Sequence, residues 1–141
     1  MRGNRMKAVG FVIAAALAGE AQEAGRYADA LSLYAIIDRY YSNTVYYTSA
    51  LYSESVCHDK LGDRGAAIAA MARYCDAETT PLRQVSAKMG LAQMYQKDGF
   101  DMIAAAETNE TEAAVAEQLK RGTAQIVRAI KQFRDFAGQC D

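Results

Sequence analysis

Three glycines lie 37 residues apart, at Gly25, Gly62 and Gly99, and an alanine follows each of them five residues later. A fixed interval between about 20 and 50 residues is typical of chains built from stacked, similar units. Glycine ends helices readily, because without a Cβ it adopts the left-handed backbone conformation at little cost. The spacing therefore predicts an internal repeat whose turns fall at these glycines.

The hydrophobic periodicity is helical along almost the whole chain, with few β-branched runs and little strict alternation. It predicts an all-α protein with helices at about 6–24, 27–41, 45–61, 64–76, 82–98, 100–107 and 111–137. Short connections at the glycines would make neighbouring helices antiparallel. The length of 141 residues fits a single domain, 1–141.

Composition and motifs argue against several function classes. A net charge of −1 without any block of like charges provides no field for nucleic acid. The chain has no phosphate-binding glycine loop, nucleophile elbow or His-Glu-x-x-His motif. The apolar run 8–18 is too short to span a bilayer. We therefore expect a protein that is not an enzyme, needs no cofactor or metal, binds no nucleic acid and does not span a membrane.

The residues around the glycines recur in type as well as in spacing. The third repeat has Leu91, Ala92, Tyr95, Gly99 and Ala104. At the same offsets the first repeat has Leu17, Ala18, Gly25, Tyr27, Ala30 and Tyr34. The second keeps Ser55, Gly62, Ala67 and Met71, with Glu54 and His58 in place of Leu and Tyr. This arrangement resembles the tetratricopeptide repeat (TPR) family, in which small residues let paired helices approach closely.

The resemblance implies a short right-handed α-solenoid of helix hairpins. Its repeats would cover about 8–44, 45–81 and 82–108, and a capping helix at about 111–137 would cover the end of the stack. The 37-residue period is similar to the longer repeats of bacterial envelope proteins. Those proteins commonly have a Tyr-Pro pair at the end of the second helix, whereas here Ser42 follows Tyr41.

The resemblance also implies a concave groove lined by the first helix of each repeat, which in this family binds protein. The second repeat would contribute Ser49, Tyr52, Val56, Asp59 and Lys60, and the third Ser86, Met89, Gln93, Gln96 and Lys97. Ala15, Gly19 and Gly90 occupy positions where chaperone-binding members carry a carboxylate clamp, so that activity is disfavoured. The alternative is that these are ordinary solvated helix positions.

Tyrosines crowd the connection between the first two repeats, at Tyr40, Tyr41, Tyr46, Tyr47 and Tyr52. Tyrosine is enriched at protein interfaces, because its ring buries area while its hydroxyl keeps a polar partner. Helical spacing would turn Tyr40 and Tyr47 inward and leave Tyr41 and Tyr46 outside; a core role is the alternative. The predicted protein-binding residues are thus Tyr41, Tyr46, Tyr52, Val56, Lys60, Met89, Gln93 and Lys97.

The cysteines give no metal-binding spacing, and the only histidine, His58, adjoins Cys57. Neighbouring helical residues point about 100° apart, so this pair is poorly placed for nucleophilic catalysis. A Cys57-dependent enzyme remains the weaker alternative function. Cys57 and Cys75 are expected to be buried, a disulfide between them being the alternative, and Cys140 is expected to be exposed.

Both ends of the chain allow two interpretations. Arg2, Arg5 and Lys7 precede the run 8–18, as in a secretory signal or an organellar targeting sequence. The register of Leu17 and Ala18 with Leu91 and Ala92 favours a structural helix instead. The last helix is amphipathic, with an acidic start and a basic end. It would cap the stack or, alternatively, dock on another subunit through Phe133 and Phe136.

These features together predict a non-enzymatic adaptor or a structural subunit of a larger assembly. Its partner is a protein of unknown identity, and self-association is a further option. A soluble cytoplasmic or organellar location is favoured. The alternative is a periplasmic envelope-assembly factor exported by its N-terminal segment.

Overall fold

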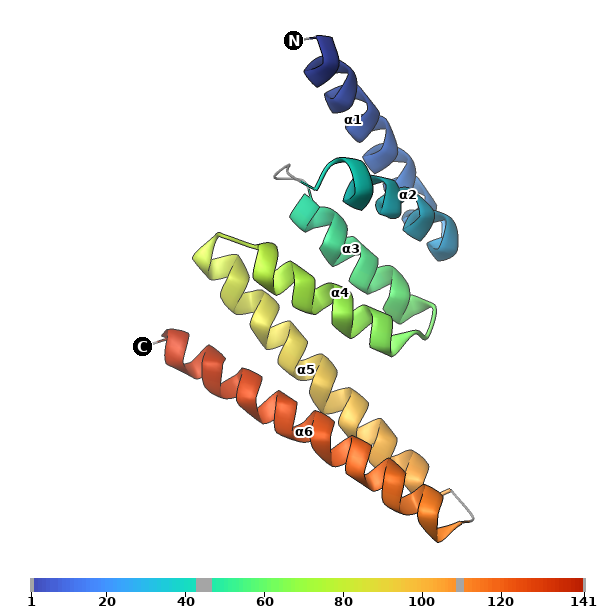
Figure 1. The fold of residues 1–141 in the computed structure, drawn as a ribbon, viewed down its shortest axis with the longest axis vertical. Coiled ribbons are helices and arrows are strands. Elements are labelled where there is room, and N and C mark those ends of the chain that lie inside the picture. Colours follow the sequence, from blue (N-terminus) through green and yellow to red (C-terminus); the bar gives the residue numbers. More distant parts are fainter. Residues whose placement is uncertain (1, 43–46, 109–110, 141) are drawn as a thin grey trace. The chain divides into compact units, whose positions relative to one another are not determined.

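The computed structural model describes residues 2–42, 47–108 and 111–140, and this part of the chain consists of helices without a β-strand. The all-α prediction is confirmed. Figure 1 shows the helices in chain order: α1 (Arg2–Glu23), α2 (Tyr27–Tyr40), α3 (Tyr47–Lys60), α4 (Arg64–Ala77), α5 (Pro81–Ala106) and α6 (Glu112–Cys140). None of the described helices has a stretch both long enough and apolar enough to cross a membrane.

The chain divides into two compact units, which we describe separately. Unit 1 is Met1–Ala77 and contains α1 to α4; unit 2 is Glu78–Asp141 and contains α5 and α6. Within unit 1 each helix packs against the next along the chain, and within unit 2 α5 packs against α6. A continuous solenoid through all the helices stays a prediction.

The first two predicted turns are the same structure repeated. Gly25 and Gly62 have φ of 77° and 80°, the left-handed region that favours glycine. The Gly25 N–H donates to Gln22 and the next N–H to Ala21, which are the two bonds of a Schellman helix end. The corresponding donors 37 residues later, Gly62 and Asp63, bond to Asp59 and His58 in the same way. Unit 1 therefore contains two equivalent helix hairpins.

Small buried residues bring the helices of each hairpin together. Ala18 of α1 and Ala30 of α2 are fully buried, and so are their equivalents Ser55 of α3 and Ala67 of α4. The Ser55 hydroxyl donates to the Ala67 carbonyl at 2.8 Å, so this buried polar group has a partner. The small residues predicted to allow close packing in these repeats thus do lie in the core of unit 1.

The third predicted turn is wrong. α5 runs without interruption from Pro81 to Ala106, so the separate helices at 82–98 and 100–107 do not exist and repeat 82–108 is not a hairpin. Gly99 is buried in the middle of α5, where an added Cβ would lie 2.8 Å from the carbonyl oxygen of Gly122 on α6 and 2.8 Å from Ile126. Gly99 therefore serves the close crossing of two helices and ends neither of them.

Polar contacts accompany this crossing in unit 2. The Gln125 amide of α6 donates to an Asp98 carboxylate oxygen of α5 at 2.5 Å, and Arg128 donates to the Gln125 carbonyl oxygen at 2.7 Å. The Arg128 guanidinium also lies 6.0 Å from the ring centre of Tyr95. The expected last helix is therefore real, and it packs along α5; its role as a cap for a stack stays a prediction.

Candidate functional site

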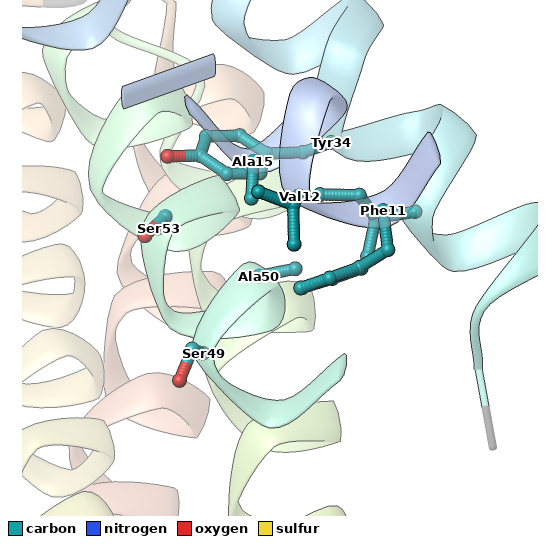
Figure 2. A pocket seen from close by; sticks show the side chains of 8 residues that line it. Phe11, Val12, Ala15, Tyr34, Ser49, Ala50 and Ser53 are labelled. Atoms are coloured by element: carbon teal, nitrogen blue, oxygen red, sulfur yellow. The ribbon is translucent and has the colours of Figure 1, made fainter. Parts of the chain in front are cut away.

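The candidate site consists of two hollows between α1 and α3 in unit 1, which together we call the groove. Its first hollow has a volume of about 380 Å³ and is lined mostly by apolar side chains: Phe11, Val12, Ala15, Tyr34, Ile37, Ser49, Ala50 and Ser53. Figure 2 shows these side chains converging from α1, α2 and α3, with Val12 projecting toward Ala50. Val12 is 62% exposed, so the apolar wall is open to solvent. We call this hollow the apolar end of the groove.

A second hollow of about 390 Å³ lies between the same two helices, about two turns further along. It is more polar and is lined by Gly19, Gln22, Glu23, Tyr27, Val56 and Lys60. Val12 of α1 lines the first hollow, and Gly19, seven residues later, lines the second. On α3 the corresponding residues are Ser49 and Val56, which are also seven residues apart. Because seven residues are about two helical turns, both hollows lie on one side of each helix. We call the second hollow the charged end.

The repeat explains which positions share this groove. Val12 and Ser49 are 37 residues apart, as are Gly19 and Val56, and Glu23 and Lys60. Equivalent positions of the two hairpins therefore form the two walls, and the chemistry along the groove changes because the equivalent residues differ in type.

Tyr34 of α2 lies between the two ends of the groove. Its hydroxyl donates to Oε1 of Gln22 at 2.8 Å, so it is attached to the charged end while its ring lines the apolar end. Burial raises the pKa of Tyr34; a hydrogen bond with Ser53 lowers it, and the nearby Cys57 and Glu54 raise it further. Tyr34 therefore stays a neutral phenol near neutral pH and is suited to hydrogen bonding rather than to acid–base chemistry.

A partly buried ionic cluster joins α2, α3 and α4 beside the groove, with the Arg73 side chain 50% exposed. Arg73 lies 3.5 Å from an Asp38 carboxylate oxygen and donates to the Tyr47 hydroxyl at 3.0 Å. Glu54 is 6% exposed, and its pKa is raised to about 8, first by burial and then by its hydrogen bond with Asp38 and the negative charge there. In the described part of the chain, Oδ1 of Asp38 and Oε1 of Glu54 are buried and accept no hydrogen bond.

These features assign the cluster a structural role. Two buried carboxyl groups short of donors are relieved when one holds a proton and donates it to the other. The residues that line the groove do not include Asp38, Glu54 or Arg73. The cluster therefore joins three helices of unit 1 and is not positioned to act on a molecule bound in the groove.

The thiols of unit 1 are poorly suited to catalysis. Cys57 and Cys75 are both buried, and no disulfide joins them. Burial raises the pKa of Cys57, and the nearby Glu54 carboxyl raises it further. A nucleophilic cysteine needs a lowered pKa and access to substrate, and Cys57 has neither. The residues that the structure describes also contain no group of three or more Cys, His, Asp or Glu side chains able to hold a metal ion.

The predicted binding residues separate into groups. Val56 and Lys60 both line the charged end of the groove, and Ser49 lines the apolar end; that they bind protein stays a prediction. Met89, Gln93 and Lys97 follow one another at four-residue steps on the exposed side of α5 in unit 2. Whether they extend the groove stays a prediction.

The predicted tyrosine surface is not one surface. Tyr40 is 63% exposed, and Tyr41 is half-buried against Phe11 with ring centres 5.6 Å apart, so the expected orientation of these two is reversed. Tyr47 belongs to the ionic cluster, and the half-exposed Tyr52 packs its ring edge-on against Tyr74 of α4. Tyr46 and the side chains of Phe136 and Cys140 lie outside the described residues.

Two features of this region were not found from the sequence: the apolar end of the groove and the ionic cluster beside it. The apolar end of the groove includes Phe11 and Val12, which read as part of a general apolar run. Glu54 was noticed only as a departure from the repeat. Glu54 lies 37 residues after Leu17, at the equivalent position of the second repeat. A charged residue at a position that is apolar in the first repeat indicates a buried charge. No family model, curated protein or solved structure matches the chain.

Proposed function

We propose that the protein is a non-enzymatic interaction module of the TPR type, and that unit 1 binds a short peptide segment of a partner protein in the groove between α1 and α3. The observation that carries the proposal is the pair of hollows in register along the same two helices, one apolar and one charged. An open groove with an apolar end and a few polar groups is the usual form of a peptide-binding surface.

The dimensions of the groove favour a peptide over a small molecule. From Ser49 to Lys60 the α3 wall is about 16 Å long, at 1.5 Å per residue. An extended chain covers about 3.3 Å per residue, so the groove would hold roughly five residues. The bound segment would place apolar side chains against Phe11, Val12 and Ala50, and charged or polar ones beside Glu23 and Lys60.

The two hairpins in unit 1 support membership of the TPR class. They have the same Schellman helix ends and the same small buried residues, 37 positions apart. The alternative function as a Cys57-dependent enzyme is disfavoured, because that thiol is fully buried and burial raises its pKa.

Export would change the groove itself. Cleavage after Ala18 would remove Phe11, Val12 and Ala15 from the apolar end. It would also remove Ala18 itself from the core that it forms with Ala21 and Ala30. We therefore favour a retained N-terminal helix. Sequencing of the N-terminus of the native protein tests this: a first residue at Gly19 would indicate export and would remove one wall of the proposed site.

Selection from a displayed peptide library against the full-length protein tests the binding proposal. We expect short peptides with apolar residues at one end and charged residues at the other, with dissociation constants in roughly the micromolar range. Val12→Asp should weaken the selected peptides at least about tenfold, because it puts a charge in the apolar end. The matched control is Val9→Asp, since Val9 is equally exposed on α1 but does not line the groove.

A charge reversal at the other end gives a second measurement. Lys60→Glu places two carboxylates, Glu23 and the new one, at the charged end. Selection against this variant should return peptides whose charged end is basic. Equal loss of binding in the Val9 and Val12 variants, or the same peptides from the Lys60 variant, would count against the groove as the binding site.

A further inference from the structure

α6 has a row of exposed residues that its packing against α5 does not use. The row runs along one side of the helix at steps of three and four residues: Glu112, Ala116, Leu119, Thr123, Val127, Ile130 and Arg134. The side that meets α5 is different and includes the buried Gly122, Gln125 and Ala129. Leu119, Val127 and Ile130 are 42%, 58% and 47% exposed, so the centre of the row is an open apolar surface.

The α6 row is complementary to a second copy of the same row that runs in the opposite direction. Counted outward from Thr123, Leu119 matches Val127, Ala116 matches Ile130, and Glu112 matches Arg134. If two copies of α6 lie antiparallel with Thr123 facing Thr123, apolar residues therefore meet apolar residues on both sides of the centre. At each end of the row a carboxylate of one copy meets a guanidinium of the other.

The charges select the antiparallel direction. Within the row, the acidic residue Glu112 lies at the start of α6 and the basic residue Arg134 lies near its end, whereas Glu117 is already paired with Arg121 of the same helix at 3.2 Å. A parallel pair would place like charges together, whereas an antiparallel pair brings the acidic start of each helix beside the basic end of the other. The helix dipoles also oppose one another in that arrangement.

We propose that the chain forms a homodimer in which the α6 row of one copy packs antiparallel against the same row of a second copy, about a twofold axis at Thr123. Such an isologous interface requires a surface that complements itself, and this is what the row provides. An unrelated helix would need an apolar stripe and charges, but it would not require the matched reversal of charge about Thr123.

The interface is modest in size. The row covers about six helical turns, or roughly 33 Å. Three large apolar side chains from each copy would be buried, with small or hydroxyl side chains between them. We therefore expect a reversible dimer with a dissociation constant on the order of 10 µM. The proposal concerns unit 2 and does not depend on the groove of unit 1.

Sedimentation velocity on the full-length protein, from about 1 to 300 µM at low salt, measures the association directly. Val127→Glu puts a carboxylate opposite Leu119 of the second copy and should weaken the dimer at least about thirtyfold. The matched control is Ala124→Glu, which is also exposed but lies about 100° further round the helix, outside the row. The control should dimerise like the unmodified protein.

Charge exchange and cross-linking test the register. Glu112→Arg alone should weaken the dimer about fivefold, and adding Arg134→Glu should restore it, because the pair reforms with its signs reversed. In a Cys140→Ser background, Thr123→Cys should form a disulfide-linked dimer when copper–phenanthroline is added as the oxidant, since the two cysteines face each other across the axis. This second result does not depend on whether the Val127 variant folds.

Each outcome of these experiments either overturns or supports the homodimer. A protein that stays monomeric at about 300 µM overturns the proposal. So does a dimer that Val127→Glu leaves intact, or one in which Thr123→Cys does not cross-link. Three results together support it. Val127→Glu weakens the dimer, Ala124→Glu leaves it unchanged, and adding Arg134→Glu restores the affinity that Glu112→Arg alone had reduced.

Discussion

The protonated Glu54 should make the stability of unit 1 depend on pH in an unusual direction. Its pKa is raised from 4.5 to about 8 in the folded protein, because it is buried beside the Asp38 carboxyl. Between these two values the folded state therefore binds one proton more than the unfolded state. Since stability falls with rising pH wherever the folded state holds the extra proton, this contribution is full below pH 4.5 and is lost as the pH rises to about 8.

The size of the effect follows from the shift. One pH unit inside this window corresponds to about 1.4 kcal/mol of unfolding free energy. Raising the pH from about 5.5 to 7.5 should therefore remove about 2 to 3 kcal/mol. That is a large part of the 5 to 15 kcal/mol by which domains are typically stable.

Urea unfolding followed by near-ultraviolet circular dichroism measures this effect on the right unit. Eight of the nine tyrosines lie within residues 1–77, the ninth being Tyr95, so the tyrosine signal reports mainly on unit 1. Glu54→Gln should make the profile nearly flat, because the amide also donates to Asp38 but does not titrate. An exposed glutamate of α1, changed in Glu20→Gln, is the control and should keep the wild-type slope.

Parallel pH profiles for the wild-type protein and Glu54→Gln between about pH 5.5 and 8.5 would refute the reasoning. They would mean that Glu54 is ionised in the folded state and that Arg73 alone compensates its charge. Any constant offset between such parallel profiles would measure packing lost in the Glu54→Gln variant and would not change that conclusion.

The glycines provide two further predictions, each with a matched control. Gly99→Ala should destabilise unit 2 by about 2 kcal/mol, because the new Cβ meets Gly122 and Ile126, whereas Gly90→Ala on the same helix has open space and should stabilise it by about 0.5 to 1 kcal/mol. Thermal unfolding compares them, and equal effects would contradict the close crossing. Gly62→Ala should cost about 1 kcal/mol in urea unfolding because of its positive φ, and Gly62→Asn should cost less; a neutral alanine would argue against the left-handed turn.

The glycine period predicted two turns correctly and the third incorrectly, for a physical reason. Glycine is favoured both at a left-handed helix end and at a close helix crossing. A glycine in the sequence therefore does not tell which of the two it serves. At Gly25 and Gly62 the chain reverses. At Gly99 the helix continues, and the missing side chain lets α5 approach Gly122 of α6, 23 residues further along. The contact between Gly99 and Gly122 cannot be predicted from a repeat period of 37 residues.

The candidate site shows a similar division. Val56 and Lys60 were expected in a groove because the resemblance to the TPR family assigns the first helix of each repeat to it, and two well-formed hairpins preserve the register of these positions. The tyrosine surface was predicted from the clustering of tyrosines in the sequence and from helical spacing, neither of which tells which helix each ring meets. Tyr41 and Tyr47 are on opposite sides of a connection, and each packs against a helix distant in sequence: Phe11 of α1 and Arg73 of α4.

The repeat also explains how one backbone pattern produces a groove with two different ends. Equivalent positions form the walls, so a pair such as Glu23 and Lys60 lies at one level of the groove, and Val12 and Ser49 lie at another. The two hairpins share their small buried residues and turn glycines at equivalent positions, whereas the residues at these wall positions differ in type. A partner segment would therefore bind with its apolar residues at one end and its charged residues at the other. A scrambled peptide that mixes the two kinds of residue along its length should bind much more weakly, even though its composition is unchanged.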